Sequence, residues 1–398
     1  MFLLKPKFYI FVFLFFFLTK KNNKFKKFDS YVCDLRINHL KEPFGIGIED
    51  NNYSFLAKGK GPFRAFILLK NKIIQTRKIK VEESHSFYFE KPLQYNKQYK
   101  YLVKGFYGKA TLDFETSIKL NSSFIKPKNK NIFSPIFVKN FVINKKIKKA
   151  RLYITGLGLY QAFINNEKVG NAYLTPGYND YNFYLRYQTY NITELLKENK
   201  SNIFEIHMGD GWYKGRFGFH KGEHEKNLYG KEYKLCLTII IEYKDNSIDN
   251  ISTDETWKVK SSKEVANSIY DGEIIDYTLP EKPLEEVIIT KEDYRLIPDF
   301  GSLIVEKDIL YPDLYISPKK EKILDFKQNM VGFVRFKGLL QKNQEIKMSH
   351  GEVLQNKTFF NKNYRTARSI LQYKGDGKKR IYEPKYNRIF RKSRPKRF

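Results

Sequence analysis

The sequence has few of the residues that usually carry nucleophilic or metal chemistry, with 2 Cys and 6 His among 398 residues. Cys33 and Cys236 lie far apart without CxxC spacing. This excludes a disulfide framework and a thiolate metal site, and it predicts a buried or free thiol at each position. The HExxH, GxSxG, phosphate-loop and Rossmann patterns are also absent. No local motif therefore indicates catalysis.

The histidines and the neighbouring acids give no catalytic pattern either. His220 and His224 stand four residues apart, but in a glycine-flanked loop without further ligands nearby, which favours solvated histidines over a zinc site. The pairs Asp254-Glu255 and Glu285-Glu286 point to opposite sides of a strand. A catalytic acid and base must instead face each other across the bond that they cleave.

Acidic residues are scarce relative to basic ones, with 43 Asp and Glu against 73 Lys and Arg and a net charge of +30. Such a balance raises the question of a nucleic-acid or anionic-surface partner. The lysines are spread over the whole chain together with abundant Asn, Ile, Phe and Tyr, as in a general compositional drift. We therefore expect weak, salt-sensitive binding of polyanions and no specific nucleic-acid partner.

Residues 8–18, "FYIFVFLFFFL", form an apolar run between lysines. This length suits the core of a signal peptide and falls short of the ~20 residues that span a bilayer. No small-x-small cleavage site follows. An uncleaved anchor, a degenerate signal and a mistaken upstream start are all open, and the run is compatible with weak membrane association. A cytoplasmic location is favoured over an exported or membrane-anchored one.

The rest of the chain reads as short strands separated by Gly, Pro and Asn, and at 41% hydrophobic residues it can bury several cores. Turns about every ten residues are typical of β-sandwiches. The sequence therefore predicts an all-β protein of three consecutive β-sandwich domains without a helical barrel. The expected segments are an N-terminal extension at 1–28, domains at 29–118, 119–300 and 301–384, and an unstructured basic tail at 385–398.

Three loops of the second domain combine aromatic rings with oxygen-bearing side chains. They are "YLTPGYNDYNFYLRYQTYNIT" (173–193), "HMGDGWYKGRFGF" (207–219) and "SIYDGEIIDY" (268–277). A sugar has an apolar face and a rim of hydroxyls, so such loops are candidates for sugar binding. The candidate sugar-binding residues are Asn179, Asp180, Trp212, Tyr213, Asp271 and Glu273. The alternative is that each loop is an ordinary turn and that Trp212 packs onto a core.

The run "ARLYITGLGLYQAFINNEKVGNAYLTPGYNDYNFYLRYQTYNITELL", with "IHMGDGWYKGRFGF", "STDETWKV" and "SIYDGEIID", resembles the N-terminal module of bacterial alpha-L-rhamnosidases of glycoside hydrolase family 78. "LRINHLKEPFGIGIEDNNYSFLAKG" and "DFETS" resemble the fibronectin-like domain that precedes this module. "ILDFKQNMVGFVRF", "SHGEVLQNKTFFNKNYRTARSILQYKGDG" and "YEP" resemble the β-domain that follows it. The resemblance covers about residues 29–384.

The resemblance implies a fibronectin III-like domain, a jelly-roll carbohydrate-binding-like domain and a further β-sandwich. It also implies hydrolysis of terminal non-reducing alpha-L-rhamnose residues as the family activity. In the family, "YEP" leads into an aromatic strand and then a helical barrel that carries the acid and base glutamates. This chain continues with "KYNRIFRKSRPKRF" instead. We therefore expect no catalytic residue in it, and we interpret its tail as what a reading-frame shift would leave.

Related modules of the family bind rhamnose through calcium, and the resemblance implies Asn179, Asp180 and Asp271 as the oxygen donors for such an ion. It also places Trp212 and Tyr213 near the sugar-facing end of the second domain. The implied partners are rhamnose-containing glycans or glycosides. Two hypotheses follow: a truncated alpha-L-rhamnosidase that needs its barrel from another polypeptide, and a non-catalytic rhamnose-binding module or inactive gene remnant.

Overall fold

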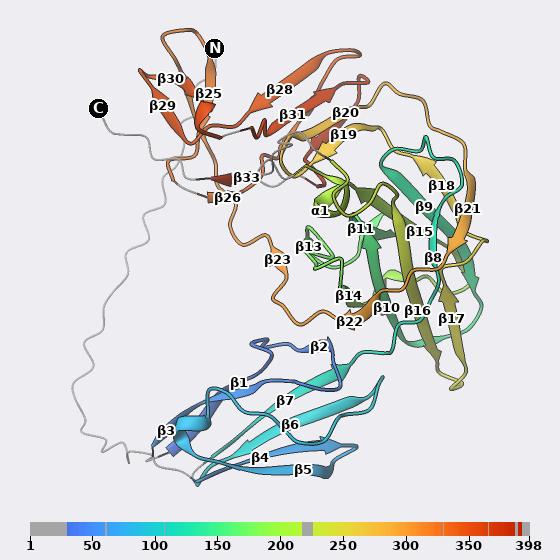
Figure 1. The fold of residues 1–398 in the computed structure, drawn as a ribbon, viewed down its shortest axis with the longest axis vertical. Helices are drawn as coiled ribbons and strands as arrows, with labels where there is room; N and C mark the ends of the chain where they lie inside the picture. The colour runs from blue at the N-terminus through green and yellow to red at the C-terminus, as the bar shows by residue number, and fades with distance from the viewer. Residues whose placement is uncertain are drawn as a thin grey trace, which may run out of the picture.

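A computed structural model describes residues 30–59, 62–106, 108–216, 226–328, 330–364, 366–386 and 389–391. Within these ranges the protein is almost entirely β-structure (Figure 1), with one short α-helix, α1 (Gly211–Lys214), and three 3₁₀ turns, η1 (Val81–Glu83), η2 (Thr193–Leu195) and η3 (Lys362–Tyr364). The prediction of an all-β fold without a helical barrel is confirmed for this described part of the chain. No described helix is long and apolar enough to cross a membrane, and residues 8–18 lie outside the described ranges.

The first sandwich, blue to cyan in Figure 1, pairs β1 (Ser30–Ile37) with β3 (Tyr53–Gly59) against a five-stranded sheet. The order of that sheet is β2 (Phe44–Ile46), β7 (Lys109–Thr116), β6 (Gln98–Lys104), β4 (Phe63–Leu69) and β5 (Lys72–Ile79). Side chains of a strand point alternately to its two faces, and on β4 the inner face carries Phe63, Ala65 and Ile67, which are fully buried. These side chains pack into an aromatic core with Phe55 and Phe87.

The second sandwich is built from one long, curled sheet of twelve strands. Trp257 is fully buried in the core of this sandwich, where it packs among apolar side chains. Along the sheet the strands are β12 (Glu167–Lys168), β11 (Leu159–Ile164), β15 (Lys200–Gly209), β9 (Pro135–Ile143), β18 (Lys258–Ser261), β21 (Glu285–Thr290), β8 (Phe124–Pro127), β16 (Lys234–Tyr243), β10 (Ile147–Leu157), β14 (Tyr184–Asn191) and β22 (Arg295–Pro298), with β17 (Ile248–Ser252) beside β16. A separate short pair joins β13 (Ala172–Tyr173) to β23 (Ile304–Val305).

The third unit, yellow to red in Figure 1, has a smaller core around Leu371, Tyr373 and Tyr382. Its four-stranded sheet runs β19 (Glu264–Ser268), β20 (Gly272–Asp276), β31 (Ile370–Lys374), β28 (Glu345–Ser349). The hairpin 264–276, predicted within the second domain, thus pairs in parallel with a strand about a hundred residues later. Short pairs complete the unit: β24 (Asp313–Ile316) with β25 (Lys322–Asp325), β26 (Met330–Gly332) with β33 (Ile389–Arg391), β27 (Phe336–Leu339) with β32 (Lys379–Tyr382), and β29 (Val353–Gln355) with β30 (Thr358–Phe360).

The prediction of an unstructured tail from Lys385 is wrong for the tail residues that the structure describes. The buried carboxylate of Glu273 accepts hydrogen bonds from the backbone N–H groups of Lys385 and Tyr386, each at 3.0 Å. The Tyr386 ring is buried, and β33 pairs with β26. The tail has no apolar period of its own, so only these long-range partners give it structure. Residues 387–388 and 392–398 lie outside the described ranges.

Candidate functional site

The loop that carries Trp212 lies between the other two predicted loops. On one side, the rings of Trp212 and Tyr178 meet edge to face with centroids 6.2 Å apart, and those of Tyr213 and Tyr181 do so at 5.3 Å. On the other side, Arg216, two residues after α1, forms a bidentate ion pair with Asp271. All three loops are therefore in contact at one end of the second sandwich. Sequence reasoning gave no role to Arg216, which links two of them.

Asn179 and Asp180 are adjacent in sequence but have different environments. Asn179 is fully buried, and its Oδ1 accepts hydrogen bonds from the backbone N–H of Arg186 at 3.0 Å and from Nε of Arg186 at 3.2 Å. Its Nδ2 donates to the carbonyl of Gly177. Asn179 thus shapes the loop from inside. Asp180 is exposed, and its Oδ1 accepts a long hydrogen bond from the backbone N–H of Asn182, at 3.3 Å. Of the two, Asp180 is accessible to a ligand.

Trp212 and Tyr213 lie on consecutive positions of α1 and face different surroundings. Tyr213 is buried in a cluster with Tyr181 and Leu185, and this burial raises the pKa of its hydroxyl. Trp212 is half-buried, and it packs both against this cluster and against the one formed by Leu159, Leu174 and Tyr386. The alternative that Trp212 packs onto a core therefore holds for part of its surface, while the rest meets the exposed ring of Tyr178.

Asp271 and Glu273 are both engaged in structural contacts. Asp271 neutralises Arg216, whose guanidinium also stacks on Tyr270 at 4.7 Å and donates from Nη1 to Thr366. Glu273 is 1% exposed and holds the backbone of Lys385 and Tyr386. Burial, and then the nearby charge of Glu264, raise the pKa of Glu273 to about 7. These two acids join the second sandwich to the third unit and the tail.

A cluster of charged and polar side chains surrounds Lys385 at the same junction. Its Nζ lies 2.7 Å from Oε1 of Glu264 and 3.0 Å from Nδ1 of His207. Burial, together with the charges of Lys385 and Lys260, lowers the pKa of His207 well below its usual value. A neutral His207 can accept a hydrogen bond from the ammonium group, which is the arrangement that the geometry requires.

The geometry does not support the calcium site that the resemblance implied. No group of three or more His, Cys, Asp or Glu side chains suited to a metal ion occurs among the described residues. Of the three expected donors, Asn179 is committed to Arg186 and Asp271 to the cation of Arg216, which leaves Asp180. Calcium prefers several converging oxygens, and one accessible carboxylate does not supply them. His220 and His224 lie outside the described residues.

The accessible part of this region is an aromatic surface, defined here as Tyr178, Asp180, Asn182, Trp212 and Tyr229. Tyr178 is 49% exposed, and its hydroxyl lies 3.0 Å from that of Tyr229. One exposed ring and two half-buried rings, beside an exposed carboxylate and amide, combine a flat apolar face with hydrogen-bonding groups. This is the combination that small-molecule sites use to orient a ligand.

Comparison with known structures shows which proteins share this arrangement of β-sandwiches. The structure of an alpha-L-rhamnosidase from Aspergillus terreus aligns with a TM-score of 0.78 at 23% identity, over 91% of this chain and 46% of that one. The Streptomyces avermitilis alpha-L-rhamnosidase, solved with L-rhamnose, aligns with a TM-score of 0.76 at 15% identity, over 92% and 55%. The fold is therefore that of the β-sandwich domains of alpha-L-rhamnosidases.

Sequence comparison leads to the same family. Residues 145–296 match the alpha-L-rhamnosidase N-terminal domain, and residues 316–391 match the bacterial alpha-L-rhamnosidase concanavalin-like domain. The chain is 30% identical over 268 residues to an alpha-L-rhamnosidase of Streptomyces avermitilis and 27% identical over 277 residues to one of Alteromonas sp., covering 25% and 30% of their lengths. The chain thus contains the N-terminal and concanavalin-like domains of bacterial alpha-L-rhamnosidases of glycoside hydrolase family 78, and it spans only about a quarter of the length of these curated relatives.

Proposed function

We propose that this chain supplies the carbohydrate-binding and structural part of an alpha-L-rhamnosidase, an enzyme that hydrolyses terminal non-reducing alpha-L-rhamnose residues. The aromatic surface carries this proposal, because it gathers aromatic rings, an exposed carboxylate and an exposed amide where two of the predicted loops meet. A rhamnose ring would place its apolar face on Tyr178 and the edge of Trp212, and its hydroxyls would meet Asp180 and Asn182. The contacts between Tyr178, Trp212 and Tyr229 fix this surface before a ligand arrives.

Binding through this surface requires neither Asp271 nor Glu273. Both carboxylates are held by other groups of the protein, and displacing them would break contacts to Arg216 and to the tail. Of the predicted sugar-binding residues, the proposed site therefore keeps Asp180 and Trp212 as ligand contacts. Asn179 and Tyr213 support it from below, as the buried neighbours of Asp180 and Trp212.

The test measures binding of L-rhamnose and a rhamnose-terminated disaccharide through tryptophan fluorescence. Trp257 is fully buried, so a change in emission reports on Trp212. We expect Tyr178→Ala and Asp180→Ala each to weaken binding about five- to tenfold, which corresponds to about 1–1.4 kcal/mol. Tyr311→Ala is the matched control, because Tyr311 is 86% exposed and lies outside the aromatic surface. Equal affinities in all variants, or no binding by the wild type, would refute the proposal.

The proposal also has a catalytic consequence. We expect the purified chain to release no rhamnose from aryl alpha-L-rhamnosides, since hydrolysis needs two carboxyl groups facing each other across the glycosidic bond. Turnover that one Asp or Glu substitution within residues 30–386 abolishes would show that the chain is an enzyme in its own right.

A further inference from the structure

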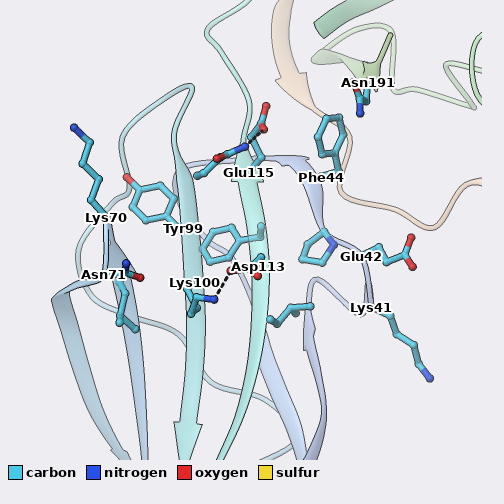
Figure 2. Close-up of a pocket in the computed structure, with 15 residues that line it drawn as sticks. Lys41, Glu42, Phe44, Lys70, Asn71, Tyr99, Lys100, Asp113, Glu115 and Asn191 are labelled. Carbon is cyan, nitrogen blue, oxygen red and sulfur yellow. Dashed lines mark hydrogen bonds and ion pairs between the residues drawn. The ribbon is translucent and has the colours of Figure 1, made fainter. Parts of the chain in front are cut away.

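A groove of about 670 Å³ lies on the first sandwich where it meets the second. Its walls come from the connection between β1 and β2, from β2, from the β4–β5 turn and from β6 and β7, and Asn191 at the end of β14 closes it (Figure 2). The volume falls within the range of about 300–1,000 Å³ that is typical of small-molecule sites. No residue of the aromatic surface contributes to this groove.

The apolar part of the groove is held rigidly. Tyr99 and Phe114 are cross-strand partners on β6 and β7, with rings stacked at 5.4 Å and an interplanar angle of 22°. Phe44 lies under the guanidinium of Arg151, whose Cζ is 4.9 Å from the ring centroid. Gly45 follows Phe44 with a φ of +65°, and a Cβ there would lie 2.2 Å from the side chain of Thr189. The second sandwich therefore fixes the position of Phe44 through close packing.

The groove is close to neutral although the chain carries a charge of +30. Lys100 pairs with Asp113 at 2.9 Å, and Lys41 pairs with Asp34 at 3.4 Å. Glu115 is buried, and its carboxylate is neutralised by Arg151 at 3.0 Å and by Lys149 at 3.2 Å. Lys41 and Lys100 are thus matched by anions of the protein itself, and the lining charges of Lys70 and Glu42 have opposite sign, which argues against an anionic ligand.

Two charged side chains that line the groove have no ion-pair partner among the described residues, namely Lys70 and Glu42. Lys70 and Asn71 form the two-residue turn between β4 and β5, with φ of 48° and 63°, and this turn holds Lys70 at the rim. Figure 2 shows Lys70 and Glu42 on opposite sides of Tyr99. One rim therefore offers a hydrogen-bond donor, and the other offers an acceptor.

From this geometry we propose that the groove is a second carbohydrate-binding site, which takes a neutral oligosaccharide segment. Its apolar part, where Phe44, Leu68 and Leu112 are half-buried beside the buried rings of Tyr99 and Phe114, matches the apolar face of a sugar ring. Lys70, Glu42 and the amide of Asn71 match the hydroxyls. Net neutrality selects an uncharged glycan over a uronate or a sulfated one. The site shares no residue with the aromatic surface, so it stands or fails independently of the function proposed above.

The experiment measures binding of neutral oligosaccharides of two to four residues, with an oligogalacturonate of the same length for comparison, by calorimetry on the full chain. The test variant is Glu42→Ala with Lys70→Gly, in which glycine preserves the positive φ of the turn. The matched control is Glu82→Ala with Lys320→Gly, since Glu82 is exposed and Lys320 also has a positive φ, at 63°. Both double variants leave the net charge unchanged.

We expect a neutral oligosaccharide to lose at least fivefold in affinity in the test variant and less than twofold in the control. We also expect its affinity to change less than twofold between low and high salt, since no charge on the ligand is neutralised. Equal weakening in both variants, binding of the oligogalacturonate alone, or no binding of any oligosaccharide would overturn the proposal. Tyr178→Ala should leave this binding unchanged, and a loss there would place it at the aromatic surface instead.

Discussion

Replacing Tyr386 should reveal how strongly the chain beyond β32 is attached to the second sandwich. The ring of Tyr386 is 1% exposed and packs with Leu159 and Leu174, beside Trp212. It lies directly on Gly209, where a Cβ would be 2.5 Å from the ring. The backbone on both sides of this contact belongs to regular strands or is held by Glu273, so the site has little freedom to collapse.

The magnitude follows from this burial and from the state of the hydroxyl group. Truncating a buried aromatic side chain to alanine usually costs about 3–5 kcal/mol, and more when the cavity cannot collapse. The hydroxyl of Tyr386 is buried and has no hydrogen-bond partner in the described part of the chain. An unpaired buried polar group costs about 1–3 kcal/mol. Tyr386→Ala should therefore lose about 3–5 kcal/mol, whereas Tyr386→Phe should match or exceed the wild-type stability.

Urea unfolding followed by tryptophan fluorescence measures both variants, because Trp212 packs against the same cluster as Tyr386. With a urea m-value of about 2–3 kcal/mol/M, the alanine variant should shift the transition midpoint down by roughly 1–2 M. The three units need not unfold together, so circular dichroism should be recorded in parallel to separate their transitions. A midpoint of the alanine variant within about 0.3 M of the wild type would refute this account of the junction. A phenylalanine variant as unstable as the alanine variant would show that the hydroxyl has a partner.

Three further predictions concern charged groups. The pKa of Glu273 is raised from 4.5 to about 7, so the folded state binds this proton more tightly; the contribution of Glu273 to stability should be fully present below about pH 4.5 and be lost as pH rises to about 7, and the difference in unfolding free energy between the wild type and Glu273→Gln should change over that range in urea unfolding. Glu115→Ala should cost about 3 kcal/mol in the same assay, because it leaves Arg151 buried without its carboxylate, while the exposed Glu82→Ala should cost almost nothing. Adding a chelator should leave the unfolding midpoint unchanged, since Arg216 already neutralises Asp271; a large drop in the midpoint would reveal a metal site.

Local sequence patterns determined the class of fold. Alternation in the sequence of β4, "FRAFILL", puts Phe63, Ala65 and Ile67 on one face, and the structure buries all three. Asn165 and Asn166 form the turn between β11 and β12 with positive φ, a conformation that asparagine tolerates better than most residues. These features depend on neighbours within a few residues, which is why the sequence alone sufficed. The resemblance to the rhamnosidase family was also visible in the sequence, because many matching positions lie along one continuous stretch.

The roles of the candidate site residues were decided by the tertiary structure. Asp271 and Glu273 have the composition of ligand-binding acids, but Arg216 and the backbone at Lys385 occupy them. The partners lie 55 and 112 residues away in the chain, and no local pattern records such a distance. The tail was misjudged for the same reason. The sequence by itself determined the strands, the turns and the family. The tertiary structure decided which polar groups stay accessible to a ligand, because burial and charge neutralisation arise only when distant segments of the chain pack together.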